Sequence, residues 1–154
     1  MPTEPYRTSI EISAPPDAVY PFLTEPVSIL RWMGDYAVLD ARPGGAFTLD
    51  INGVPVRGHY IELDPPHRLV IAWGHAGSDL LPPGSSTVEI TLEPIAGGTR
   101  LQLEHRDLPP REAEMHAIGW PHFLRRLAIA GTGKDPGPDP FATAPPHRPT
   151  DTGR

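Results

Sequence analysis

The sequence predicts an α+β fold in which a seven-stranded antiparallel sheet is covered by one long C-terminal helix. Between residues 36 and 106, segments with alternating apolar and polar residues follow one another, mostly through tight turns. This pattern is typical of consecutive antiparallel strands. From residue 111 to residue 130 the apolar residues recur instead every three or four positions, which is the period of one helical face.

The N-terminal part predicts one strand and two short helices. Residues 8–12 alternate and form the first strand, and a pair of prolines followed by Asp17 then marks a helix start. We expect short helices over residues 18–23 and 27–33. They are separated at Pro26, because a residue that precedes proline disfavours the helical conformation.

Six further strands are expected, each bounded by Gly, Pro or Asn. Asn52-Gly53 is the strongest turn signal, since Asn-Gly is favoured in two-residue hairpin loops. The longest loop, residues 75–86, holds Leu80 and Leu81, which predict a lid over the inner face, a contact with the sheet edge, or a dimer contact. The six strands cover residues 36–40, 46–51, 54–63, 68–73, 87–93 and 99–106.

The last helix has an apolar stripe and charges that match its dipole. Glu112 and Glu114 lie in its first turn, and Arg125 and Arg126 lie near its end. Pro121 either kinks this helix or starts its main part at Trp120-Pro121. The stripe consists of Ala113, Ala117, Trp120, Leu124, Leu127 and Gly131.

Strand parity makes the sheet one-sided, so a helix on its apolar face would enclose an apolar space. The opposite parity is polar, with Thr48, Asp50, Thr87, Glu89, Thr91, Glu93, Arg100, Gln102 and Glu104. The inward rows are Phe47, Leu49 and Ile51; Leu69, Ile71, Trp73 and His75; Val88, Ile90 and Leu92; and Leu101, Leu103 and His105.

Composition separates a domain from a tail. The chain has 154 residues with 22 Pro and 15 Gly. Residues 132–154 hold 6 of these prolines, 3 glycines and one large apolar residue, Phe141. Such a segment buries too little apolar surface to offset its ordering entropy, so we expect a disordered Pro-rich tail after a domain at residues 6–131.

Bulk properties exclude several classes. The chain has no Cys, which excludes disulfides and thiolate sites. The net charge of −6 speaks against nucleic-acid binding. Neither a signal peptide nor a membrane span is visible in the sequence. Because 12 of the 13 basic residues are Arg, which is typical of a GC-rich genome, we expect a bacterial cytoplasmic protein.

Five motifs in a fixed order resemble the Hsp90-ATPase-activator-homologue (AHSA1-like) branch of the START-like (SRPBCC) superfamily. This resemblance covers residues 6–131 and implies a helix-grip fold, with a deep cavity for an apolar ligand between sheet and helix. The motifs are Leu30-Arg31-Trp32, Arg42-Pro43-Gly44-Gly45, Gly58-x-Tyr60-x-Glu62-Leu63-x-Pro65-Pro66-x-Arg68-Leu69 ending in Trp73, Gly98-Thr99-x-Leu101-x-Leu103-x-His105, and Gly119-Trp120.

The candidate ligand-binding residues are mostly aromatic, because such cavities need rigid apolar walls and few polar anchors. Plain core packing is the alternative for each of them. His75 and His105 have inward parity and could anchor a polar group or serve as a base. The candidate set is Trp32, Phe47, Tyr60, Trp73, His105, Trp120, Phe123 and Leu124.

Three functions remain open. The first is binding of a small hydrophobic molecule, lipid-like or polycyclic, without chemistry and without a cofactor. The second, whose type the resemblance to the superfamily implies, is a polyketide-cyclase or hydratase-type enzyme. It would use His105, Tyr60 or Glu62 as acid/base groups, although a bulge would turn Glu62 to solvent. The third, implied by the resemblance alone, is a co-chaperone for an Hsp90-type partner. A homodimer is compatible with all three.

We expect no metal site from the sequence. His116 and His122 are six residues apart on a helix and therefore lie on different faces, and neither an HExxH motif nor a His-x-His pair occurs.

Overall fold

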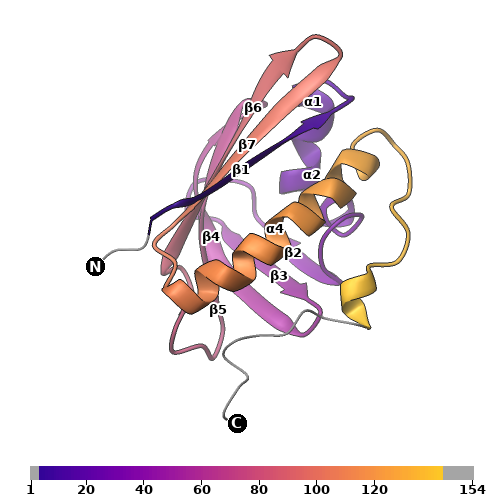
Figure 1. Cartoon of the computed structure of the whole chain (residues 1–154). Helices are drawn as coiled ribbons and strands as arrows, with labels where there is room; N and C mark the ends of the chain where they lie inside the picture. The colour runs from indigo at the N-terminus through magenta and orange to yellow at the C-terminus, as the bar shows by residue number, and fades with distance from the viewer. Residues whose placement is uncertain (1–3, 144–154) are drawn as a thin grey trace.

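The computed structural model describes residues 4–143 and confirms the α+β fold. Seven strands form one sheet in the order β1-β7-β6-β5-β4-β3-β2, and every neighbouring pair is antiparallel. Figure 1 shows α4 crossing one face of this sheet. The strands are β1 (Tyr6–Ile12), β2 (Tyr36–Leu39), β3 (Ala46–Ile51), β4 (Val54–Asp64), β5 (Arg68–His75), β6 (Ser86–Ile95) and β7 (Gly98–Arg106).

The segment between β1 and β2 forms three one-turn helices rather than two longer ones. They are α1 (Pro16–Val19), α2 (Pro21–Thr24) and α3 (Pro26–Ile29), and each begins with a proline. Proline is tolerated at the first helical position, where its missing N–H costs no hydrogen bond. The expected helix over residues 18–23 is therefore divided at Pro21.

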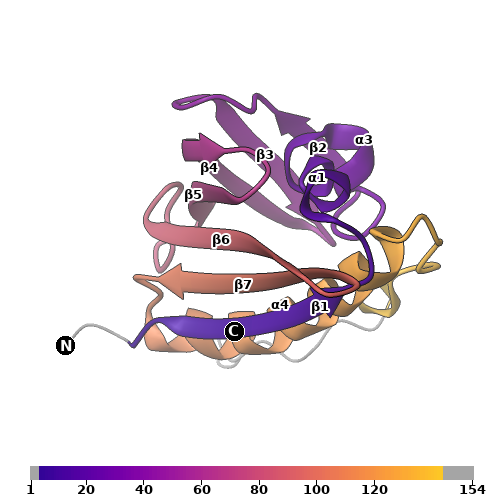
Figure 2. The ribbon, with the colours of Figure 1, turned by 90° about the horizontal axis from the view of Figure 1, so that it is seen from above.

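Helix α4 (Pro110–Ala130) is continuous, with Pro121 inside it. Figure 2 shows that the sheet curves around this helix, with β1 and β7 beside it and β2 to β4 further away. The core lies between them and includes side chains from both layers, among them Leu103 of β7 and Leu127 of α4.

The two sheet faces have the expected character. The inward rows of β3, β5, β6 and β7 are buried, although Ile51 is only partly so. The outward face carries ion pairs, in which Arg68 and Arg106 both bind Glu89 and Arg106 also binds Glu104. The alternation in the sequence therefore predicted both faces correctly.

The stripe on the first two turns of α4 was predicted incorrectly. Ala117 is exposed and Ala113 only partly buried, whereas Glu112 is 2% exposed and Met115 is buried. The hydrophobicity of the alanines predicted that they face inward, but the first turns of α4 lie against His75, and the polar residues Glu112 and His116 face it instead. Glu112 therefore faces the protein interior in addition to lying in the first turn.

The loop between β5 and β6 folds back on β5. Leu81 is fully buried, and its carbonyl accepts a hydrogen bond from the N–H of His75 at 2.7 Å, while Leu80 remains exposed. Gly74 allows this approach, because a Cβ there would lie 1.9 Å from the carbonyl oxygen of Pro82. Of the alternatives for this loop, Leu81 takes the contact with the sheet.

Residues 132–143 differ from the expectation of a disordered tail. They lead into the 3-10 helix η1 (Pro140–Ala142), which lies beside α4. Side chains from the turn between β3 and β4 and from α4 bind this segment, as described below, through hydrogen bonds to Asp139 and a ring contact with Phe141. The expected tail also includes residues 144–154, which lie outside the described residues. Among residues 4–143, no helix is both long enough and apolar enough to span a membrane.

Candidate functional site

A pocket of about 260 Å³ lies between strands β3 to β5 and helix α4. Its walls are mainly apolar, and its polar side chains are two histidines and one asparagine. The sheet side comes from β3 to β5 and the helix side from α4. The lining residues are Met33, Ile51, Asn52, Val54, Val56, Trp73, His75, Met115, His116, Gly119, Trp120, Phe123 and Phe141.

Trp73 lies at the centre of the aromatic residues beside the pocket. Its ring centroid is 5.3 Å from that of Trp120, 5.8 Å from that of Phe47 and 5.7 Å from that of His105. Such aromatic contacts add to the stabilisation from burial alone. Trp73 and Trp120 therefore form a rigid wall of the pocket.

His105 is fully buried and its two ring nitrogens are used inside the core. The indole N–H of Trp120 donates to Nδ1 at 3.1 Å, so the proton of the neutral ring is on Nε2. Nε2 donates to Oγ of Ser86 at 2.8 Å, and that hydroxyl donates to the carbonyl of Trp73 at 2.7 Å. Burial, together with the nearby His116 and His75, lowers the pKa of His105 well below 6.5. His105 is thus a neutral structural side chain.

Tyr60 and Glu62 do not meet His105 in the pocket. The hydroxyl of Tyr60 donates to the carbonyl of Leu23 at 3.0 Å, and burial raises the pKa of this tyrosine, with Tyr20 and Asp40 adding to the effect. A register shift in β4 between Tyr60 and Glu62 turns Glu62 outward, where it pairs with Arg68. The bulge that the sequence analysis considered as an alternative for Glu62 is therefore present in β4.

Three of the eight predicted ligand-binding residues line the pocket, namely Trp73, Trp120 and Phe123. The other five are buried elsewhere in the core or, for Trp32, beside a second, more polar hollow. Trp32, for example, donates its indole N–H to the carbonyl of Phe22 at 2.9 Å. These five are Trp32, Phe47, Tyr60, His105 and Leu124.

At the polar end of the pocket, His75, which the sequence offered as a possible anchor or base, lies beside two residues that the sequence did not assign to a ligand-binding site. His75 of β5, Glu112 and His116 offer ligand atoms that all lie within 4.8 Å of one another. Nδ1 of His116 donates to the backbone carbonyl of Glu112 at 2.7 Å and lies 3.7 Å from its carboxylate. The i, i+4 spacing of Glu112, His116 and Trp120 would have placed them on one helical face. His116 and His122 indeed belong to different clusters.

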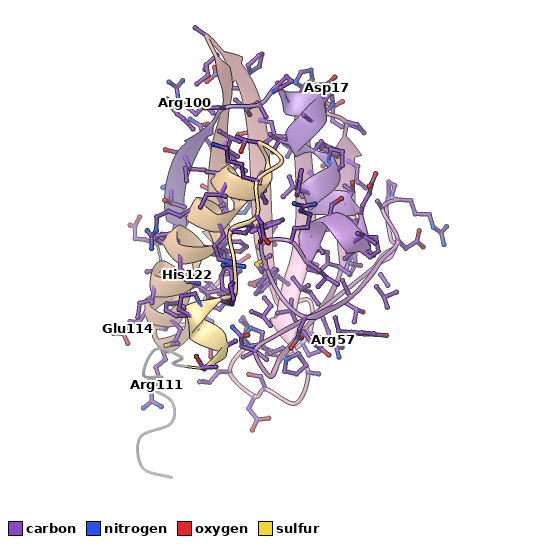
Figure 3. The ribbon with its side chains drawn as sticks, turned by 90° about the vertical axis from the view of Figure 1, so that its right-hand side faces the viewer. Asp17, Arg57, Arg100, Arg111, Glu114 and His122 are labelled. Carbon is purple, nitrogen blue, oxygen red and sulfur yellow. The ribbon has the colours of Figure 1, made fainter. Side chains whose placement is uncertain are left out.

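The segment that contains η1 closes one side of the pocket. Asp139 accepts hydrogen bonds from Asn52 at 3.0 Å and from Nε2 of His122 at 2.7 Å. Phe141 stacks on His122 with a centroid distance of 3.8 Å and lines the pocket. Figure 3 shows His122 on α4 beside this segment. Burial alone would raise the pKa of Asp139, but hydrogen bonds from Asn52, the Phe141 backbone and His122 lower it.

The comparisons with known proteins agree with this architecture. Residues 13–130 match the family model described as "Activator of Hsp90 ATPase homolog 1-like protein". An AHSA1-like protein from Rhizobium etli is 43% identical, with a TM-score of 0.71 over 90% of this chain and 88% of that one. No curated protein matches the chain.

Two further solved structures are similar at lower identity. CalU16 from Micromonospora echinospora is 29% identical, with a TM-score of 0.69 over 83% of this chain and 76% of its own. A protein from Chromobacterium violaceum is 27% identical, with a TM-score of 0.74 over 82% of this chain and 95% of its own.

Proposed function

The chain belongs to the family of activator of Hsp90 ATPase homolog 1-like proteins, and on that premise we propose that it binds one small apolar molecule in the pocket between the sheet and α4. The observation that carries this proposal is the pocket itself. It is walled by Val54, Val56, Met115, Trp120 and Phe123 and has histidines at one end. Pockets that are mainly apolar with a few polar groups are typical of small-molecule sites.

The volume of the pocket limits the size of the ligand. About 260 Å³ lies between the roughly 150 Å³ of a cavity that accepts benzene and the roughly 300–1,000 Å³ of pockets for drug-sized ligands. A molecule of one or two rings therefore fits best, and a long lipid chain fits poorly. His75 would accept or donate one hydrogen bond to a hydroxyl or carbonyl of that molecule, whereas both ring nitrogens of His116 already bind Glu112 and Trp73.

We favour ligand binding over the alternative in which His105, Tyr60 and Glu62 act as acid/base catalysts. That alternative needs two polar groups that converge on a reacting atom. Tyr60 and His105 are engaged in hydrogen bonds within the core, and Glu62 faces outward. The pocket also favours ligand binding over a co-chaperone function, because binding an Hsp90-type partner would not need a pocket of this kind.

A thermal-shift titration with 2-naphthol, a two-ring apolar probe with one hydroxyl, tests the proposal. At a probe concentration of 100 times Kd, the protein gains about 2.7 kcal/mol of stability. At about 3 °C per kcal/mol, Tm rises by roughly 8 °C.

The matched variants place a phenylalanine inside or outside the pocket. Val54→Phe adds a ring at the pocket wall and should remove the shift. Val38→Phe, at a residue of β2 that is 46% exposed, should keep it. A shift of the same size in both variants would contradict the proposal, as would no shift in the unsubstituted protein. Untargeted mass spectrometry of the purified chain would then identify a ligand that copurifies.

A further inference from the structure

Three metal-ligating side chains converge at the polar end of the pocket. His75 comes from the end of β5, and Glu112 and His116 come from adjacent turns of α4. Their ligand atoms lie within 4.8 Å of one another. His75 is 7% exposed, and the side chains of Glu112 and His116 are 3% and 10% exposed. Two imidazoles and a carboxylate are thus held together away from bulk water.

Their mutual geometry is close to that of ligands around one ion. Tetrahedral zinc with bonds of about 2.0–2.1 Å separates its ligand atoms by roughly 3.3 Å. The ligand atoms of His75, Glu112 and His116 lie within 4.8 Å of one another, and the rings of His75 and His116 are nearly parallel with their centroids 5.7 Å apart. Small side-chain rotations would therefore bring the three ligand atoms onto one cation.

The hydrogen bonds of His116 fix its ring as they do in metal-binding histidines. Nδ1 donates to the backbone carbonyl of Glu112, so the lone pair is on Nε2. Metal-bound histidines commonly donate their other N–H to a backbone carbonyl in this way. Nε2 accepts from the indole N–H of Trp73 at 3.2 Å, a long hydrogen bond that a cation at Nε2 would replace.

A third histidine lies next to the cluster. His105, with its ring centroid 4.8 Å from that of His116, is not a fourth ligand, because it is fully buried, does not line the pocket and binds Trp120 and Ser86 with its two nitrogens.

We propose that His75, Glu112 and His116 bind one divalent transition-metal ion at the polar end of the pocket. Imidazole ligands select zinc, copper, nickel or iron over magnesium and calcium, which prefer oxygen. Three protein ligands leave a fourth position, and His75 and His116 both line the pocket. An oxygen of a pocket ligand could occupy that position. The metal site does not depend on the proposed function, since it is tested with the metal alone.

The test is a calorimetric titration of the untagged, metal-free chain with Zn²⁺, supported by the visible spectrum with Co²⁺. We expect one ion per chain and the strong Co²⁺ absorption of a four-coordinate site, and no binding of Mg²⁺. Glu112→Gln keeps the shape of the side chain and should weaken Zn²⁺ binding by more than tenfold, as should His75→Ala.

His67→Ala provides the control, because His67 is exposed in a turn and far from the cluster in the fold. It should bind Zn²⁺ as the unsubstituted chain does. Thermal unfolding of each variant without metal shows that the variants are folded. The proposal is wrong if Zn²⁺ does not saturate a single site, or if folded Glu112→Gln binds it unchanged. Equal binding of Mg²⁺ would also overturn it.

Discussion

Ser86→Ala tests whether the buried hydrogen-bond chain through His105 stabilises the wall of the pocket. Ser86 is 1% exposed, and its hydroxyl accepts from Nε2 of His105 and donates to the carbonyl of Trp73. Its removal leaves one buried donor and one buried acceptor without this partner. Each such group costs about 1–3 kcal/mol, so the free energy of unfolding should fall by roughly 2–6 kcal/mol.

Urea unfolding measures this change in free energy, and in thermal unfolding Tm should fall by about 6–18 °C at roughly 3 °C per kcal/mol. Ser9→Ala is the matched control, because Ser9 is an exposed serine on β1. It should change stability by less than about 0.5 kcal/mol. The NMR signal of the imidazole N–H of His105 should exchange slowly with water in the unsubstituted protein and rapidly in Ser86→Ala. A loss of stability no larger than that of the control would refute the reasoning.

Three further substitutions have definite expected outcomes. Gly119→Ala should raise the free energy of unfolding by about 0.5–1 kcal/mol in urea, because a Cβ there meets no atom within 4 Å; a loss would show that the pocket needs this glycine. The pKa of His105 is lowered in the folded chain, so between that pKa and pH 6.5 only the unfolded chain binds a proton at this residue, and the free energy of unfolding should fall by up to about 1.4 kcal/mol per pH unit below pH 6.5. In His105→Gln the free energy of unfolding should depend less steeply on pH, and an equal dependence would count against a neutral ring. Asp139→Ala should speed amide hydrogen exchange in residues 132–143 at pH 7, and protection unchanged by the substitution would rule out a role for this carboxylate. Because the pKa of Asp139 is lowered in the folded chain, the carboxylate should stabilise the segment fully above pH 3.8 and less as the pH falls through the folded pKa.

The sheet could be predicted from the sequence because one of its faces is buried and the other is not. A strand with one wet face must alternate, as Leu101 and Leu103 alternate with Arg100 and Gln102. The turns added the boundaries, with Asn52 and Gly53 both at positive φ between β3 and β4. Strand positions, pairing and inward rows followed from these two features.

The first half of α4 could not be predicted in the same way. Hydrophobicity selects Ala113 and Ala117, yet Glu112 and His116 face inward. Their partner His75 lies far away in the sequence at the end of β5. Only the packing of α4 on the sheet brings the three together, so spacing along the chain could not reveal the cluster.

The position of the segment after α4 was also not predictable from its composition. Its attachment depends on Asp139 and Phe141, whose partners Asn52 and His122 belong to other elements. Proline content predicts that a segment forms no regular helix or strand, but it does not predict which side chains elsewhere will bind it.

The most direct test of ligand binding in the pocket is an NMR titration of the isotope-labelled chain with 2-naphthol. We predict saturable shifts and intermolecular NOEs from the naphthyl protons to the methyl groups of Val54, Val56 and Met115. The outer-face methyl group of Thr91 should not respond. NOEs to the outer face, or no saturable shift of the three pocket residues, would contradict it.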